Sequence, residues 1–476
     1  MGRQYPARLT HATAKFWNRS LLPFYVHEDR VVELYRIHPF SLECSREIKP
    51  EGIHLRMLFI AQTRAFSDFQ PHKNLVNRHS IHLTTIRQRR MAQAKMATED
   101  FHETAKSWAT IKHTLLADYL RLFVGKTGYG RNNVYYVDAF VGPGLLDDGS
   151  KGSAIYAAEA ASSPIHESRR DVLKCINIEP HPETFARLEA ATAKYVASGH
   201  VRNLPGRFND RREEVLEIIG DDPALFFIDP FGTEGAELNS LKQVKRRGAI
   251  REALVRYDDT RVKRLLSWAA NNADSLDEAA RKTSEKFLKR ADQLTDESAV
   301  CCWLDGEPNA REALINGYIR AAREQGVFKF GIAYPVRNPD TQGHRYFLVH
   351  LCDFEDGYTW MANFMAAAEI TYEQKREDLF NGCQQSFFSV KDFHLAARDT
   401  IVKQIIASFP EMCILRGWGK GVVVQNRKVF SALVDTFSWR VSRADYLKAL
   451  KKLNSDGLLS FESLDDGDVM TFNVVP

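Results

Sequence analysis

The sequence lacks any long apolar run that charges do not interrupt. Charged side chains recur every few residues along all 476 positions, so no transmembrane helix is predicted. No continuous apolar core follows Met1, which argues against a secretory signal. Apolar residues make up 44% and charged residues 26%, as in soluble globular proteins. We therefore expect a cytoplasmic protein of two or three domains that makes no membrane contact.

Cysteines are few and show no pairing pattern. The seven cysteines contain no CxxC spacing and no set that resembles metal ligands, so no metal site is expected. Cys301 and Cys302 are adjacent and poorly placed to bond to each other. Free thiols in a reducing compartment are the simpler interpretation.

Net charge is also small, at +4, but it is unevenly distributed. Residues 1–95 hold 16 Lys and Arg against 7 Asp and Glu, which leaves −5 for the remainder. This segment shows little sustained periodicity. Residues 1–100 are therefore predicted to be a basic extension, either a nucleic-acid-binding arm or a segment outside the fold. Translation could even start at Met91 or Met96.

Regular patterning begins at Phe101 and alternates between helices and buried strands. Short apolar runs end at Asp138, Glu179 and Asp229, and helical patterns separate them. Such alternation predicts an α/β fold with a doubly wound, Rossmann-like sheet over residues 101–375. Residues 260–326 are too long for one crossover and are predicted to be a helical insertion. Two strands around residues 338–343 predict a closing β-hairpin.

Residues 376–476 have a different pattern. Three helical runs and two short strands predict a winged-helix domain, in which Ser442 caps the third helix and Gly457 follows its end. Basic residues on or beside that helix would contact phosphates if it were a recognition helix. They are Arg440, Arg443, Lys448, Lys451 and Lys452. A solvated basic face on a protein-docking module explains them equally well.

The first two strand ends carry groups suited to a nucleoside cofactor. "YVDAFVGPG" places Gly142 and Gly144 after Asp138, where glycines allow backbone N–H groups to approach a ligand. A dinucleotide fingerprint requires a third glycine, and position 147 is Asp, which disfavours a nicotinamide oxidoreductase. Glu179 ends the second strand, where a carboxylate can accept both ribose hydroxyls.

Two further acids have alternative explanations. Asp210 follows a probable third strand and is either a helix N-cap or an acceptor for an adenine amine. Asp229 ends "ALFFIDPFG", where Pro230 cannot extend a central strand and the chain must turn. It is either an N-cap of the next helix or a functional carboxylate at the ligand-binding edge.

Five motifs resemble those of the three-Cys-motif partner proteins (TcmP). In order they are "IKHTLLADYL", "YYVDAFVGPG", "KGSAIYA", "INIEPHPETFARL" and "FFIDPFG". A more distant resemblance is to ribosomal-RNA adenine-N6 methyltransferases with a DPPY motif. The resemblance covers about residues 105–370, and the tail is also similar to that of TcmP.

The resemblance implies a class I S-adenosylmethionine-dependent methyltransferase and a three-cysteine partner protein encoded nearby. It implies that Lys112 pairs with the cofactor carboxylate, where the alternative is a solvated helix lysine. Asp229 and the Pro230 carbonyl would accept hydrogen bonds from a target amine, while Phe231 stacks on the base. Phe231 and Gly232 replace the Pro-Tyr of DPPY.

Two functional hypotheses follow. The first is an S-adenosylmethionine-dependent methyltransferase that acts on an exocyclic amine of a nucleic-acid base. The second is a catalytically inactive, cofactor-binding partner subunit whose winged helix docks a protein or binds DNA. Methyl transfer to a polymer separates the two.

Residues 1–95 are predicted to be dispensable, because they lack a periodic apolar face that would pack against the sheet. A protein that starts at Met96 should keep the melting temperature and the cofactor affinity of the full chain. Thermal melts and calorimetry check this. A large loss of either would show that the extension is part of the fold.

Overall fold

The computed structural model describes most of the chain beyond residue 106. The described ranges are 107–131, 133–162, 172–245, 248–338, 343–380, 390–464 and 468–473, together with three short strands near the N-terminus. Compact structure divides into two units, residues 1–83 and 84–476. The prediction for residues 1–100 lies outside the described residues, apart from those three strands.

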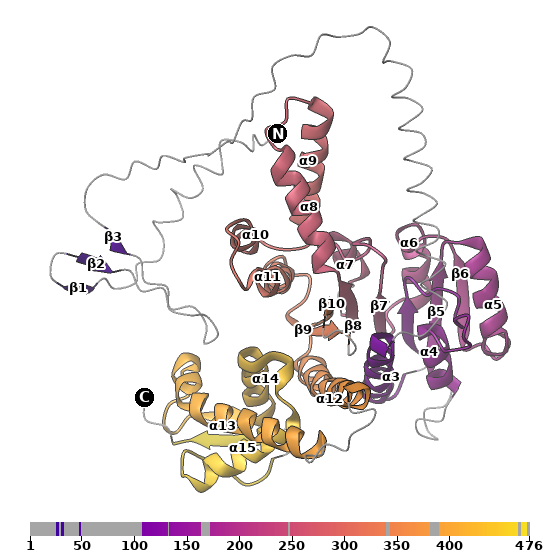
Figure 1. Cartoon of the computed structure of the whole chain (residues 1–476). Helices are drawn as coiled ribbons and strands as arrows, with labels where there is room; N and C mark the ends of the chain where they lie inside the picture. Colours follow the sequence, from indigo (N-terminus) through magenta and orange to yellow (C-terminus); the bar gives the residue numbers. More distant parts are fainter. Residues whose placement is uncertain are drawn as a thin grey trace, which may run out of the picture. The chain divides into compact units, whose positions relative to one another are not determined.

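The first unit contains one small antiparallel sheet. Its strands are β1 (Tyr25–His27), β2 (Arg30–Val32) and β3 (Glu47–Ile48), paired in that order. The second unit contains the seven-stranded sheet and all the helices that the structure describes (Figure 1).

A seven-stranded sheet organises the second unit, in the order β6-β5-β4-β7-β8-β10-β9. Five adjacent strands, from β6 to β8, run parallel in four pairs, and β10 runs antiparallel to both β8 and β9. The strands are β4 (Val134–Asp138), β5 (Leu173–Glu179), β6 (Val201–Pro205), β7 (Ala224–Ile228), β8 (Arg251–Tyr257), β9 (Phe330–Arg337) and β10 (His344–Cys352). This is the class I methyltransferase sheet, closed by a hairpin, that the sequence predicts.

The centre of the sheet is buried on both faces, which explains its continuous apolar runs. Every residue of β4 and of β7 is buried. Strand order reverses between β4 and β7, since β5 and β6 lie on one side of β4 and β7 on the other. A ligand site is expected at the carboxyl ends of the strands beside this reversal.

Helices cover both faces of the sheet. One face carries α3 (Ser107–Thr127), α4 (Ser153–Ser162) and α12 (Glu355–Phe380), and α5 (Pro182–Ala197) packs on α4 and β6. The other carries α6 (Phe208–Ile219), α7 (Leu238–Val244) and the predicted insertion. The insertion comprises α8 (Asp259–Asn272), α9 (Glu278–Ala291), α10 (Glu297–Leu304) and α11 (Ala310–Glu324). Within the described ranges, no helix is both long enough and apolar enough to cross a bilayer.

The C-terminal module has the element order of a winged helix. It comprises α13 (Val390–Arg416), β11 (Val423–Gln425), α14 (Asn426–Phe437), a 3-10 turn η2 (Ser438–Arg440), α15 (Arg443–Ser455), β12 (Leu459–Phe461) and β13 (Val469–Phe472). Its sheet order is β11-β13-β12. Ser442 caps α15 through a reciprocal capping box with Asp445, as predicted for Ser442. The predicted two-stranded tail is β12 and β13, which pair antiparallel after α15. The additional strand β11 was not predicted, because three residues are too short to show a period-2 pattern.

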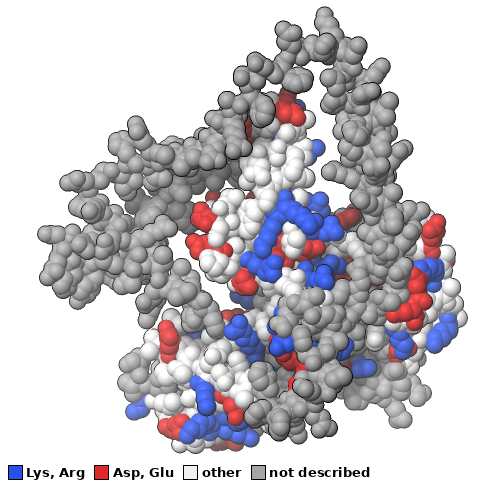
Figure 2. Space-filling view, viewed as in Figure 1, with Lys and Arg blue, Asp and Glu red and all other residues white. Residues whose placement is uncertain are grey.

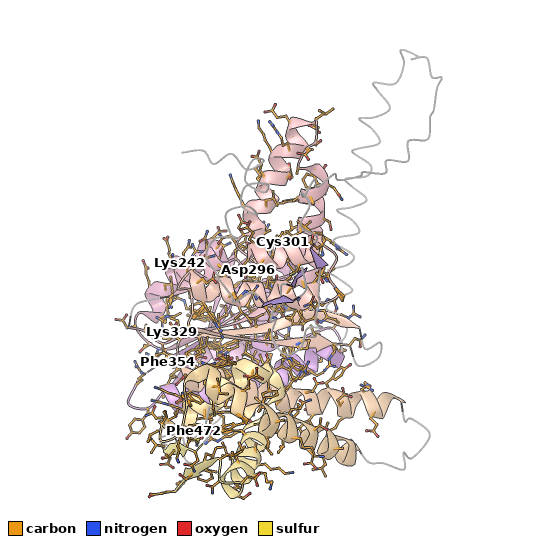
Figure 3. The ribbon with its side chains drawn as sticks, turned by 90° about the vertical axis from the view of Figure 1, so that its left-hand side faces the viewer. Lys242, Asp296, Cys301, Lys329, Phe354 and Phe472 are labelled. Carbon is orange, nitrogen blue, oxygen red and sulfur yellow. The ribbon has the colours of Figure 1, made fainter. Side chains whose placement is uncertain are left out.

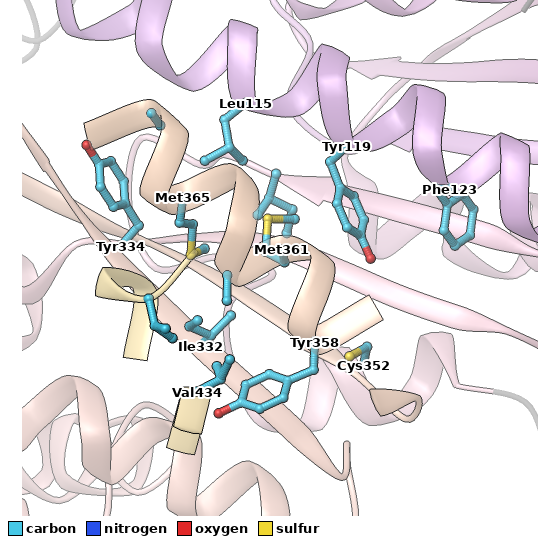
Figure 4. Packing of buried hydrophobic residues seen from close by; sticks show 14 of the residues in the cluster. Leu115, Tyr119, Phe123, Ile332, Tyr334, Cys352, Tyr358, Met361, Met365 and Val434 are labelled. Atoms are coloured by element: carbon cyan, nitrogen blue, oxygen red, sulfur yellow. The ribbon is translucent and has the colours of Figure 1, made fainter. Parts of the chain in front are cut away.

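This module shares one hydrophobic core with the sheet through α12. Met361 and Met365 of α12 lie between α3 on one side and Ile332 of β9 and Val434 of α14 on the other (Figure 4). The Tyr358 hydroxyl also donates to Asp435 of α14 at 2.9 Å. In Figure 3, Phe472 of the module lies on the opposite side of the sheet from Asp296 and Cys301 of the insertion. The module is therefore fixed to one face of the sheet, where Asp435 of α14 also pairs with Arg323 of α11 at 3.7 Å.

Candidate active site

Glu179 connects the turns that follow the two central strands β4 and β5. Its carboxylate accepts the backbone N–H of Gly142 at 3.0 Å and that of His181 at 2.9 Å. The residue is 5% exposed and lines a cleft. Burial raises the pKa of Glu179, while the two N–H groups oppose that rise. A carboxylate has about four lone-pair sites, so two remain for a ligand in the cleft.

The glycine turn after β4 needs its glycines. Gly142 and Gly144 have φ angles of 71° and 76°, a region that other residues rarely adopt. A Cβ on Gly144 would lie 3.2 Å from the Ala191 side chain and 3.3 Å from that of Leu188. Gly144 therefore allows close packing on α5, whereas Gly142 lines the cleft itself.

Asp138 lies beneath this turn and is fully buried. Its carboxyl group accepts the Tyr136 hydroxyl at 3.0 Å and the Phe140 N–H at 3.3 Å. Burial raises its pKa to about 6, although hydrogen bonds from Ser153 and Tyr136 oppose the shift. Asp138 therefore supports the turn from below and does not line the cleft.

Asp229 lies in a cluster of charges that is almost closed to solvent. Its carboxylate pairs with the Lys112 ammonium and lies 3.5 Å from the Arg256 guanidinium. The three side chains are 12–16% exposed. Burial alone would raise the pKa of Asp229, but Lys112 and then Arg256 outweigh it and lower the pKa. Burial likewise lowers the pKa of Lys112, and Asp229 outweighs it and raises the pKa. All three groups are therefore charged at neutral pH.

The structure thus pairs two predicted site residues with each other. The sequence predicted Lys112 as a partner of the cofactor carboxylate, and Asp229 as the acceptor of a target amine. The alternative of a solvated lysine is wrong. The N-cap interpretation of Asp229 is also wrong, because the next helix begins at Leu238 with Glu237 as its N-cap.

Asp210 is exposed in the first turn of α6, whose N-cap is Arg207. The N-cap interpretation of Asp210 is therefore wrong, since the helix begins three residues earlier than an N-cap at Asp210 would require. An acid in the first turn favours the helix dipole in any case. Among the described residues, those that line the cleft at this point are Arg207 and Phe208.

A cleft of about 1310 Å³ opens at the carboxyl edge of the sheet. One end is formed by the turn at Gly142, by Glu179 and by the start of α5. Pro230 and Phe231 line its middle, and Phe231 is 45% exposed. The far end is formed by α8 and α9. The cleft therefore joins the predicted cofactor edge to the predicted target position and continues onto the insertion.

The predicted basic residues of the C-terminal module lie elsewhere. Lys448 pairs with Asp399 at 2.6 Å and Lys452 with Asp456 at 2.7 Å, all at the surface, and Lys451 is exposed. The Arg440 guanidinium lies 5.9 Å from the Trp439 ring.

Arg443 is the first residue of α15. Its backbone N–H donates to the side chain of Asn363 of α12 at 3.0 Å, and its guanidinium lies 5.7 Å from the ring of Trp360, also of α12. In the part of the chain that the structure describes, no residue beyond 375 lines the cleft. The N-terminal part of a recognition helix normally reads bases. Here that part of α15 packs against α12.

Several site residues were not predicted. Arg256 and Tyr346 complete the Asp229 cluster, and the Arg256 guanidinium lies 4.5 Å from the Tyr346 ring. A charged residue inside the buried strand "EALVRY" was the available signal for Arg256. The cleft residues of α8 and α9 carried no such signal, because arginines on amphipathic helices are usually solvated.

Comparisons with known proteins give only structural similarities of low score. No family model and no curated protein matches the chain. Solved structures similar to it include an O-methyltransferase from Bacillus cereus in complex with SAH, at 11% identity and a TM-score of 0.28, covering 55% of this chain and 88% of that one. The O-methyltransferase TomG from Streptomyces achromogenes, in complex with SAM, is 15% identical with a TM-score of 0.26, covering 51% and 80%.

A putative rRNA-methylase from Clostridium thermocellum is 12% identical with a TM-score of 0.24, covering 53% of this chain and all of that one. At such scores these structures say nothing about substrate. The function is therefore inferred below from the residues of this chain.

Asp138 predicts a pH effect on stability. Its pKa is about 6 in the folded protein and 3.8 ordinarily, so the folded state holds this proton more tightly than the unfolded state. Stability from this group is present below about pH 4 and is lost as pH rises through 6, by roughly 3 kcal/mol. Asp138→Asn should lack that loss. Denaturant melts of both proteins at pH 4–7 check this, and parallel curves would contradict it.

Proposed function

We propose that the protein is an S-adenosylmethionine-dependent methyltransferase. The main support is the hydrogen bond from the Gly142 N–H to the Glu179 carboxylate, at the carboxyl edge of a class I sheet. Backbone N–H groups and a buried carboxylate converge there on one end of a cleft. In open α/β sheets this edge binds nucleosides, and an acid at the second strand end accepts ribose hydroxyls.

The residues fit that cofactor. Asp147, Glu179 and Glu183 line the same end of the cleft, and a sulfonium ion is a cation. Phe140, which is partly exposed, offers apolar surface for an adenine ring. Gly142 can adopt its φ angle without a Cβ that would narrow the cleft. When bound, the cofactor supplies an activated methyl group, so the chain needs mainly to position the acceptor.

The acceptor position is at Pro230 and Phe231, in the middle of the cleft. An exposed aromatic ring beside a backbone carbonyl suits a planar base that carries an exocyclic amine. Asp229 directly precedes Pro230 in the chain, and Lys112 and Arg256 hold its carboxylate in place. Its remaining lone pairs would accept the amine while the two cations fix its orientation. We propose a nucleic-acid base as substrate, in line with the DPPY-like motif.

The second candidate is an inactive, cofactor-binding partner subunit. The cluster around Asp229 supports it, because a carboxylate with two buried cationic partners can also be a purely structural ion-pair cluster with no catalytic role. Phe231 and Gly232 in place of Pro-Tyr favour this candidate as well. A three-cysteine partner protein, implied by the resemblance to TcmP, stays part of both proposals.

Glu179→Ala should weaken binding of S-adenosylmethionine by about one to several kcal/mol, because charge-assisted bonds to both ribose hydroxyls would be lost. Calorimetry on the purified protein measures this, with Glu183→Ala as a control at the same end of the cleft. Melting curves show whether the variant is folded. Unchanged affinity in a folded Glu179→Ala protein would contradict the assignment.

Asp229→Asn should lower methyl transfer by orders of magnitude, because the amide donates where the target amine must donate. It also leaves Lys112 without a buried counter-charge, whereas Arg256 keeps Asp258 at 4.0 Å. The unpaired Lys112 costs about 3–5 kcal/mol of stability. The double variant Asp229→Asn/Lys112→Met removes one of those cations and should recover part of the melting temperature.

Single-turnover transfer from labelled S-adenosylmethionine to mixed tRNA, rRNA and DNA separates the two candidates. Assays use saturating cofactor, with and without the product of the neighbouring gene. If Asp229 orients the amine, the double variant regains stability but not turnover. Turnover that returns with stability would reduce Asp229 to a structural role. No transfer by the wild-type protein in any condition would favour the inactive subunit.

A further inference from the structure

The far end of the cleft combines arginines with exposed aromatic rings. It is formed by α8 and α9, an antiparallel helix pair that projects from the body of the second unit (Figures 1 and 3). The cleft-lining residues of this pair are Arg261, Arg264, Trp268, Phe287 and Arg290. Figure 2 shows Lys and Arg side chains gathered in the region of α7 and α8.

The two aromatic rings form a platform that is open to solvent. The rings of Trp268 and Phe287 meet edge to face, with centroids 4.9 Å apart at 68°. Trp268 is 36% exposed, and Phe231 in the same cleft is 45% exposed. Exposed aromatic rings in one cleft indicate a ligand. Nucleic-acid bases stack on such rings whatever their sequence.

The charges at this end are available to an anion. Arg264 has no ion-pair partner in the described ranges. Arg261 pairs with Asp258 at 3.2 Å and Arg290 with Glu237 at 2.6 Å, with the arginines 49% and 42% exposed. Exposed pairs of this kind contribute little, so a phosphate could displace either carboxylate.

The charge of the cleft lining differs between its two ends. Three acids and two arginines line the cofactor end, where Arg187 pairs with Asp147 at 2.5 Å, whereas three arginines and Glu234 line the insertion end. The lining is therefore most positive where a polyanionic substrate would lie. Arginines alone would suit an acidic peptide, but arginines interleaved with a stacking platform suit unpaired bases on a phosphate backbone.

We propose that α8 and α9 bind a single-stranded nucleic acid and guide it toward Phe231. This names the substrate class of the proposed methyltransferase and rests on that function. The strand lies on the insertion, on the face of the sheet opposite the C-terminal module. Its phosphates contact Arg264 and Arg290, and an unstacked base contacts Trp268.

The test uses the full chain and a fluorescein-labelled strand of mixed sequence, made as DNA, as RNA and as duplex DNA. Anisotropy titrations give the affinity and its salt dependence. Arg264→Ala/Arg290→Ala should weaken single-strand binding about tenfold and lower the salt slope by about one or more. The control is Arg281→Ala/Lys286→Ala, which removes the same charge from exposed positions of α9 outside the cleft.

Trp268→Ala should also weaken binding about tenfold, and Trp268→Phe should restore most of it. Photo-crosslinking should map the strand to α8 and α9, which separates this site from any binding by residues 1–95. Preference for RNA over DNA, or the reverse, identifies the substrate. Equal loss in the control variant would overturn the site, as would tight duplex binding or displacement of the strand by polyglutamate.

Cofactor affinity, measured on the same proteins, separates the two proposals. Intact S-adenosylmethionine binding with unchanged strand affinity in all variants would overturn this inference alone. Strand binding that depends on Arg264, Arg290 and Trp268, in a protein that does not bind the cofactor, would support the site and overturn the proposed function.

Discussion

The candidate site depends on one buried carboxylate, that of Glu179. Its two oxygens hold the N–H groups of Gly142 and His181, and so join the turns after β4 and β5. An unpaired carboxylate at 5% exposure would cost several kcal/mol, so these bonds fix where both turns lie. The shape of one end of the cleft follows from them.

The second constraint is the cluster around Asp229. Lys112 comes from α3, Asp229 from the end of β7 and Arg256 from β8, so three elements meet through their charges. Removing Asp229 would leave Lys112 without a carboxylate partner, whereas Arg256 would keep Asp258 at 4.0 Å, so Asp229 is the member on which the cluster depends. The cluster also directs the turn at Pro230 and Phe231 into the cleft. A rigid support for that turn is what transfer to a positioned acceptor requires.

Much of this was predictable from the sequence, because the central strands β4 and β7 are buried on both faces and appear as short apolar runs. The ends at Asp138, Glu179 and Asp229 are where a polar residue interrupts such a run. The pairing of Lys112 with Asp229 was not predictable, since 117 positions separate them and only the packing of α3 on the sheet joins them. The role of α12 in joining the sheet to the C-terminal module was not predictable either. A helix buried between two modules is apolar on several sides and has no clear amphipathic period.

Hydrogen exchange with and without S-adenosylmethionine tests the central claim most directly. If Gly142 and Glu179 form the cofactor edge, the cofactor should slow exchange in the peptides around residues 138–144 and 179–184. Exchange in the C-terminal module should stay the same. Binding without protection of these two turns, or protection confined to another part of the chain, would contradict the account.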